Sequence, residues 1–65
     1  MKLYLNDDVF ETEETMLVPF LESLNIDLKR AVVVINDIPV QKDKWHETEI
    51  KPEQRLELLE FVGGG

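Results

Sequence analysis

The chain contains no cysteine, and its only glycines are the last three residues of the 65. Without cysteine, disulfide bonds and thiolate metal sites are excluded. No apolar run approaches the roughly 20 residues of a membrane span, and the polar start MKLYLNDD is not typical of a signal peptide. We therefore expect a cytoplasmic protein with no membrane partner.

Positive charge is also scarce, with 7 Lys and Arg against 14 Asp and Glu and a net charge of −7. Such a surface repels phosphate backbones, so nucleic acid is not expected as a partner. A partner with a basic surface would be attracted to it. The same charge is equally typical of a chain that is acidic only to stay soluble.

The first part of the chain predicts a β-hairpin over residues 2–12. Leu3 and Leu5 alternate with Tyr4, and the turn formers from Asn6 to Asp8 separate two extended stretches. A domain of this length buries only about 60% of its unfolded surface. The apolar face of the hairpin is therefore an important part of a small core.

An amphipathic helix is predicted next, over residues 16–25. Its apolar positions recur at i, i+3, i+4 and i+7, as Leu17, Phe20, Leu21 and Leu24. Thr15 is a possible N-cap, and Pro19 is tolerated only within the first turn. We expect this apolar stripe to rest on Leu3 and Leu5 of the hairpin.

The second half predicts three more strands. AVVVIN is typical of a central strand that is at least partly covered on both faces, and DIPV predicts a turn into an edge strand because Pro39 cannot donate to a ladder. QKDKWHETEI predicts a helical turn with a short extended piece. KPEQR predicts a turn with Pro52 in second position, and LELLEFV predicts the last strand. The expected order is ββαβββ.

Several polar or aromatic residues could suggest a site, but each has a simpler interpretation. His46 near Asp43, Glu47 and Glu49 lacks a second nitrogen or sulfur ligand, so we interpret this group as a solvated loop. Asp7 and Asp8 are interpreted as turn formers, and Trp45 as a plug for the core. We expect no metal site and no catalytic residue in the chain.

Three stretches, LYLND, AVVVINDIPVQKDKW and RLELLEFVGGG, resemble the ThiS family of thiamine-biosynthesis sulfur carriers. The resemblance implies an α+β, β-grasp (ubiquitin-like) fold, with a mixed sheet of four to five strands packed on one helix. It also implies a β-grasp domain over residues 1–62 and a flexible Gly-Gly-Gly tail over residues 63–65. Glu14 and Gln54 depart from the family pattern, which often has glycine at these positions.

The resemblance further implies a carrier function for the end of the chain. The Gly65 carboxylate would be adenylated by an E1-like, ThiF-type enzyme that uses ATP, and then converted to a thiocarboxylate. A cysteine desulfurase or a rhodanese would supply the sulfur, and a ThiG-type thiazole synthase would receive it. Gly63 and Gly64 would let the tail thread the partner's active site, because they carry no Cβ. The carrier itself would bind no cofactor.

Strand alternation predicts where the partner docks. If Leu56 and Leu58 face the core, then Glu57, Leu59 and Phe61 face outward. We expect a docking patch that consists of Leu59, Phe61, Val62, Val32 and Val34. An outer sheet face that is merely half apolar would give the same pattern.

Other functions fit the same sequence features. A molybdopterin-type sulfur carrier shares the fold and the tail. A ubiquitin-like modifier would conjugate Gly65 to lysines. A plain β-grasp interaction module would leave the tail unused.

Overall fold

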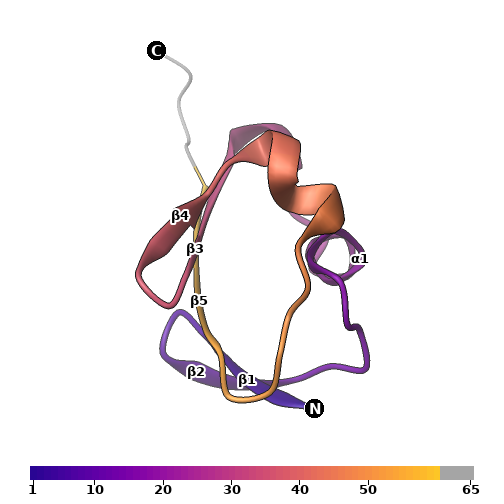
Figure 1. Ribbon diagram of the computed structural model, residues 1–65, viewed down its shortest axis with the longest axis vertical. Helices are drawn as coiled ribbons and strands as arrows, with labels where there is room; N and C mark the ends of the chain where they lie inside the picture. Colours follow the sequence, from indigo (N-terminus) through magenta and orange to yellow (C-terminus); the bar gives the residue numbers. More distant parts are fainter. Residues whose placement is uncertain (61–65) are drawn as a thin grey trace.

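The structure is a computed structural model that describes residues 1–60, which form a five-stranded mixed sheet packed on one α-helix (Figure 1). Two 3-10 helices, η1 and η2, complete the described elements. In chain order these are β1 (Lys2–Leu5), β2 (Asp8–Glu11), α1 (Leu17–Ser23), η1 (Leu28–Arg30), β3 (Ala31–Ile35), β4 (Ile38–Val40), η2 (Lys42–Glu47) and β5 (Arg55–Glu60). The predicted ββαβββ order is confirmed.

The strands lie in the order β2-β1-β5-β3-β4. Only the β1/β5 pair is parallel within residues 1–60, and the other neighbours are antiparallel. The strand expected to be central, AVVVIN, is therefore one place from the middle, which β5 occupies. β3 is buried at alternate residues and half-buried at the others. β4 is an edge strand, as Pro39 predicted.

Both hairpin turns are made by an Asn-Asp pair in the left-handed region. The φ angles are 49° and 71° at Asn6 and Asp7, and 49° and 70° at Asn36 and Asp37. Positive φ at both central residues is typical of the type I′ turn, whose twist matches that of the flanking strands. Asn and Asp tolerate this conformation better than other non-glycine residues. The hairpins can therefore close without glycine.

The helix is shorter than predicted, and its start is not capped by Thr15. Met16 is the N-cap residue and makes no side-chain capping bond, while the Thr15 carbonyl accepts a hydrogen bond from the Ile50 N–H at 2.9 Å. The Thr15 backbone thus pairs with the segment before β5. Pro19 lies in the first turn, as expected. Asn25, with φ of 60°, follows the C-cap and ends the helix in the left-handed conformation.

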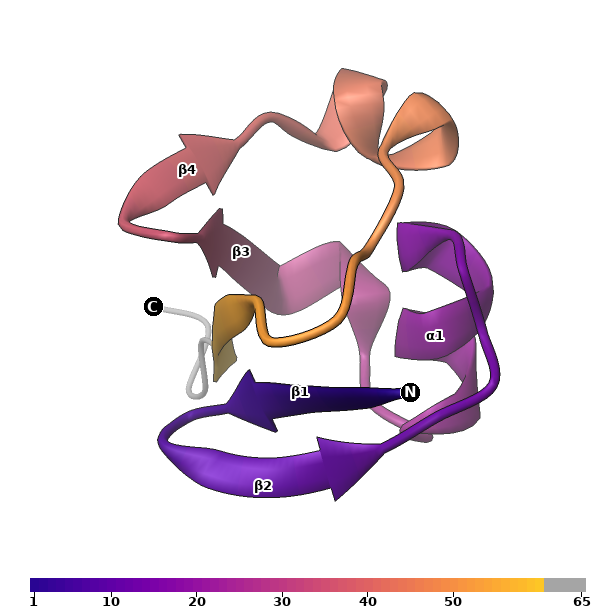
Figure 2. The same ribbon diagram turned by 60° about the horizontal axis from the view of Figure 1, so that its bottom comes forward.

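The core lies between the sheet and the layer that α1 and η2 form on one side of it (Figure 2). The rings of Phe10 and Phe20 meet edge to face, with centroids 5.5 Å apart. Trp45 is buried, and its indole N–H donates to the Val40 carbonyl at 3.0 Å, so the predicted plug is confirmed. The buried residues are Leu3, Leu17, Phe20, Leu21, Ala31, Val33, Ile35, Trp45, Ile50 and Leu56.

The turn before β5 has Pro52 in second position, as predicted. The Gln54 N–H donates to the Lys51 carbonyl at 3.3 Å, and Glu53 has a φ of 67°. Neither Glu14 nor Gln54 has a positive φ, so the two departures from the family pattern do not require glycine. In residues 1–60, no helix has the length and apolar character needed to cross a membrane.

Candidate docking face and strand end

β5 is the strand that leads to the C-terminal segment, and it lies between β1 and β3. Its pairing with β3 runs from Ile35 opposite Leu56 to Ala31 opposite Glu60. Phe61, Val62 and the expected tail, residues 63–65, lie outside the described residues. The described part of the site is therefore the end of β5 and the sheet face around it.

Alternation along β5 places its leucines on opposite faces, as predicted. Leu56 is 1% exposed, and Leu58 is half-buried and packs against the core. Leu59 is 54% exposed on the other face. A large apolar side chain thus stands in solvent one residue before the end of the described strand.

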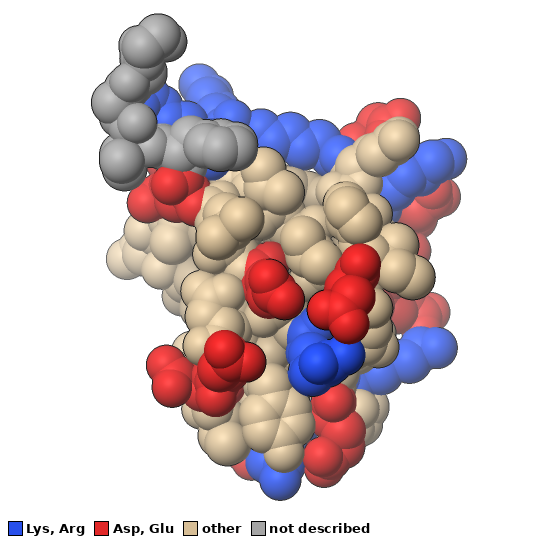
Figure 3. All heavy atoms as spheres, turned by 90° about the vertical axis from the view of Figure 1, so that its left-hand side faces the viewer, with Lys and Arg blue, Asp and Glu red and all other residues tan. Residues whose placement is uncertain are grey.

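The apolar part of the outer face continues from Leu59 onto the neighbouring strands. Val32 lies directly opposite Leu59, and Val34 lies opposite Pro39 of β4. Paired residues share a face of the sheet, so these four side chains form a single area, here named the outer patch. Figure 3 looks onto this face and shows a broad uncharged area with scattered charged groups.

The structure brings together Leu59, Val32 and Val34 of the predicted docking residues and adds Pro39. From the sequence, Pro39 was expected only to mark an edge strand. The signal that could have found it is its place two residues after the Asn36-Asp37 turn, since a two-residue turn fixes the register of the hairpin. That register sets Pro39 opposite Val34.

Charged and polar groups, with the exposed side chain of Val9 on β2, occupy the rest of the outer face. Arg55 Nη2 lies 3.0 Å from Asp37 Oδ2, and the Lys2 ammonium lies 5.6 Å from the centroid of the Tyr4 ring. Glu57 is exposed beside Val34. These groups limit the outer patch on the side toward the two hairpin turns.

Two side chains bind the end of β5 from opposite flanks. The Asn6 amide accepts from the Leu58 N–H at 2.8 Å and donates to the Leu58 carbonyl at 3.2 Å. The Glu60 carboxylate accepts from the Asp27 N–H at 3.0 Å. Neither contact was predicted from the sequence, because no local pattern relates residues so far apart.

His46 lies in the 3-10 helix η2 and not in the expected loop, and the acidic residues near it do not gather as metal ligands. Within residues 1–60, no three His, Asp or Glu side chains lie close enough together to hold a metal ion, and no pocket is present. Glu47 lies 3.4 Å from the Lys44 ammonium. Asp7 lies in the hairpin turn and Asp8 begins β2.

A family model and a curated relative match nearly the whole chain. The sequence model of the ThiS family matches residues 3–65. The chain is 27% identical over 66 residues to the uncharacterized protein ycf40 of Pyropia yezoensis, covering 100% of this chain and 93% of that protein.

A solved structure gives the same fold. The chain is similar to the crystal structure of the thiamine biosynthesis protein ThiS from Geobacter metallireducens, with a TM-score of 0.86, 23% sequence identity and 100% of both chains covered. The predicted α+β, β-grasp fold is therefore confirmed.

Proposed function

The chain belongs to the ThiS family, and on that premise we propose that it is a sulfur carrier protein for thiamine (thiazole) biosynthesis, and not an enzyme. The observation that carries this proposal is the family match, which runs from residue 3 to residue 65 and includes the three glycines. The β-grasp fold, with β5 in the middle of the sheet, supports it. We assign residues 1–62 to the folded domain and residues 63–65 to the tail.

The reacting group in this proposal is the carboxylate of Gly65, which is ionised at neutral pH as α-carboxylates are. One carboxylate oxygen attacks the α-phosphate of ATP, and pyrophosphate leaves with its bonding electrons. Sulfide then attacks the acyl carbon of the adenylate and displaces AMP, which leaves a thiocarboxylate. A donor persulfide would first give an acyl disulfide, which a thiol of the donor enzyme cleaves to the thiocarboxylate and a disulfide. A ThiF-type enzyme binds the ATP and catalyses adenylation, so the carrier binds no cofactor of its own.

The outer patch is proposed as the surface that the adenylating enzyme binds. Leu59 exposes an apolar side chain, and Val32 and Val34 are half-buried beside it, on a face that no described helix covers. An exposed apolar patch next to a reactive segment is typical of a docking site. Phe61 and Val62 would extend it toward the tail, and Gly63 and Gly64 would enter the partner's active site.

The same chain end, Gly65, would react with each partner in turn. After sulfur transfer from a cysteine desulfurase or a rhodanese, the thiocarboxylate would pass to a ThiG-type thiazole synthase. Tail residues without a Cβ suit this use, because the backbone can approach phosphates and fit narrow channels.

Intact-protein mass after incubation with ATP, a ThiF-type enzyme and sulfide tests the proposal. We expect a mass gain that corresponds to the exchange of one oxygen for sulfur. A matched variant with one extra residue after Gly65 moves the carboxylate by about 3.5 Å and should show no gain, because even ~1 Å of misplacement can cost ~100-fold in rate.

Three other outcomes would contradict the proposal. A ladder of conjugates would identify a ubiquitin-like modifier, and an unchanged mass would favour a β-grasp interaction module. If thiocarboxylate forms but supports only molybdopterin synthesis, the chain is a sulfur carrier of that related pathway.

A further inference from the structure

On the side of β5 that faces β1, a side chain continues the backbone hydrogen bonding where the strand pairing ends. The parallel ladder with β1 ends where Leu5 lies opposite Leu56, and the Asn6 backbone N–H still reaches the Leu56 carbonyl at 2.9 Å. Past this point β1 turns away into the hairpin. There the Asn6 side-chain amide binds both the N–H and the carbonyl of Leu58. An amide group offers the same donor and acceptor as a peptide, so Asn6 continues the ladder without a strand.

The β3 flank is completed by Glu60. The antiparallel ladder ends where Ala31 lies opposite Glu60, and the Glu60 carboxylate then reaches the Asp27 N–H at 3.0 Å. Asp27 is itself fixed, because its side chain accepts from the Lys29 N–H at 3.0 Å. The Lys29 carbonyl in turn accepts from the Lys42 ammonium at 2.6 Å.

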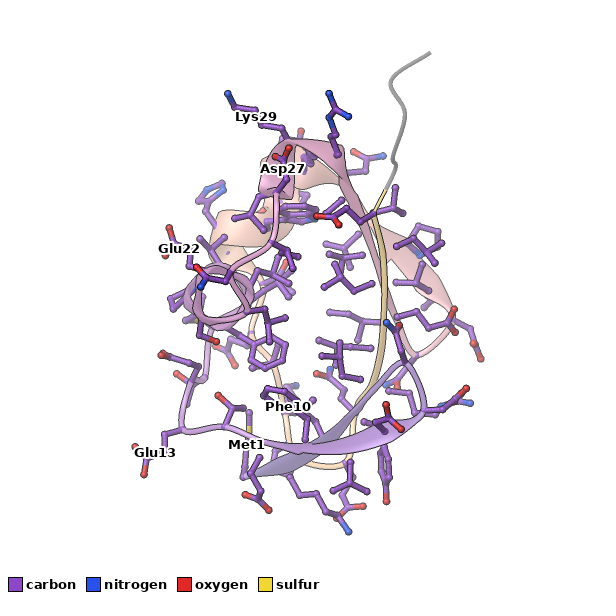
Figure 4. All side chains as sticks on the ribbon, turned by 180° about the vertical axis from the view of Figure 1, so that it is seen from behind. Met1, Phe10, Glu13, Glu22, Asp27 and Lys29 are labelled. Atoms are coloured by element: carbon purple, nitrogen blue, oxygen red, sulfur yellow. The ribbon has the colours of Figure 1, made fainter. Side chains whose placement is uncertain are left out.

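These contacts join the end of β5 to both 3-10 helices. Figure 4 shows Asp27 and Lys29 at the end of the molecule where β5 finishes. The ends of strands open more readily than their middles, and a hydrogen bond to a carboxylate is stronger than a neutral one. A strand end bound on both flanks is therefore better ordered than its last ladder pairs alone would make it.

We propose that Asn6 and Glu60 are positioning residues, which hold the end of β5 from both flanks and so fix the point from which residues 61–65 reach the partner's active site. The inference rests on the proposed function. Gly65 lies five positions after Glu60, a span of at most about 18 Å in an extended chain. With so short a reach, the strand end has to lie at the mouth of the partner's active site when Gly65 enters it, so a strand end that is already ordered in the free carrier costs less to bind.

Three variants test the Glu60 contact. Glu60→Ala removes the acceptor, whereas Glu60→Gln keeps a carbonyl oxygen that can accept from the Asp27 N–H. Glu13→Ala is the matched control, since Glu13 is exposed at the opposite end of the molecule (Figure 4) and also loses one negative charge. The 15N heteronuclear NOE of the Glu60 amide reports the order of the strand end. We expect it to fall in Glu60→Ala and to keep its wild-type value in the other two variants.

The same variants are then compared as substrates of a ThiF-type enzyme, with pyrophosphate release as the readout. We expect Glu60→Ala to raise the KM for the carrier about threefold to tenfold, the range for losing one exposed hydrogen bond. The kcat should change less, because the enzyme can order the strand end once the carrier is bound. Asn6→Gly should raise KM in the same way and lower the NOE at Leu58, with Asp7→Gly as its control. A residue that served only to stabilise the fold would leave KM unchanged in a folded variant.

Two results would overturn the inference. One is a wild-type NOE or a wild-type KM in both Glu60→Ala and Asn6→Gly. The other is equal loss in Glu60→Ala and Glu60→Gln, which would attribute the effect to charge. If the wild-type chain is not adenylated at all, the proposed function fails instead, and the NOE still decides whether the two side chains hold the strand end.

Discussion

Asn6 and Leu58, which are 52 residues apart in the sequence, form two hydrogen bonds through the Asn6 side-chain amide. The same residue has the positive φ that the β1–β2 turn needs. Asn36 repeats this arrangement, since its side-chain oxygen accepts from the Arg55 N–H at 3.0 Å and its own N–H donates to the Arg55 carbonyl at 2.8 Å. Each hairpin turn thus also holds β5, one near its start and one near its end.

Replacing Asn6 by Gly separates the two roles of this residue. Glycine accepts the positive φ without strain, so the turn should survive while both bonds to Leu58 are lost. We expect the free energy of unfolding to fall by about 1–2 kcal/mol, as measured by urea denaturation. Asp7→Gly is the control, because it carries the same entropic cost of glycine in the same turn. Equal stability of the two variants would show that the amide contributes nothing.

Strand and helix periodicity predicted most of the fold. Alternation in KLYL and in LELLE gave the correct faces for Leu3, Leu56 and Leu59, because a half-buried strand leaves a period of two in its sequence. The helix stripe likewise identified Phe20 and Leu21 as core residues. These features depend only on neighbours within one element.

Features that depend on distant parts of the chain were not predictable in the same way. Thr15 is a residue type that often caps helices. However, the backbone pairing of Met16 with Glu49 places the Thr15 carbonyl next to the Ile50 N–H. The contacts of Asn6 and Glu60 with the rest of the molecule also exist only once the sheet is assembled. A single sequence contains no periodic signal for such pairs.

The two faces of β5 predict unequal costs for acidic substitutions in this strand. Leu59→Asp should cost at most about 1 kcal/mol in the free energy of unfolding, because Leu59 is exposed. Leu56→Asp should largely unfold the domain, since it buries a charge in a small core, and Leu58→Asp should fall between them. Circular dichroism and urea titration measure these effects.

Affinity for the adenylating enzyme should depend on the exposed residue of β5, although that residue matters least for stability. Leu59→Asp should remain folded and bind the adenylating enzyme at least tenfold more weakly, in a titration followed by fluorescence or calorimetry. Val9→Asp, at an exposed apolar residue of β2 outside the patch, serves as the folded control that adds the same charge. Wild-type affinity of Leu59→Asp would place docking on the tail or on another surface.

The tail prediction concerns Gly64. Gly64→Val adds a β-branched side chain to the segment that we propose enters the active site, so pyrophosphate release should fall by at least tenfold. Gly64→Ala should show a smaller loss, because its Cβ is the smallest addition. The thermal midpoint should stay unchanged in both, since we assign residue 64 to the tail and not to the folded domain. Equal rates for all three proteins would show that steric access does not require glycine.

The last prediction uses the backbone of Glu53, whose φ is 67° after Pro52. A proline followed by a residue with positive φ is typical of a type II turn, in which glycine is favoured at the third position. At that position, a residue with a Cβ destabilises the folded protein by roughly 1 kcal/mol or more. Glycine removes this strain. It also gives the unfolded chain more conformational freedom, which destabilises the folded protein by roughly 0.5–1 kcal/mol. The Glu53 N–H, which donates to the Lys2 carbonyl at 2.7 Å, is retained.

We therefore expect Glu53→Gly to raise the free energy of unfolding by about 0.5 kcal/mol, a gain of a few degrees in the thermal midpoint of so small a domain. The exposed ion pair between Glu53 and Lys2, at 3.9 Å, contributes little. Glu53→Ala is the decisive control, because it removes the same carboxylate from this acidic chain and keeps the Cβ. If Glu53→Ala stabilises the protein as much as Glu53→Gly, relief of charge repulsion is the cause. If only Glu53→Gly does so, the turn is strained at this residue.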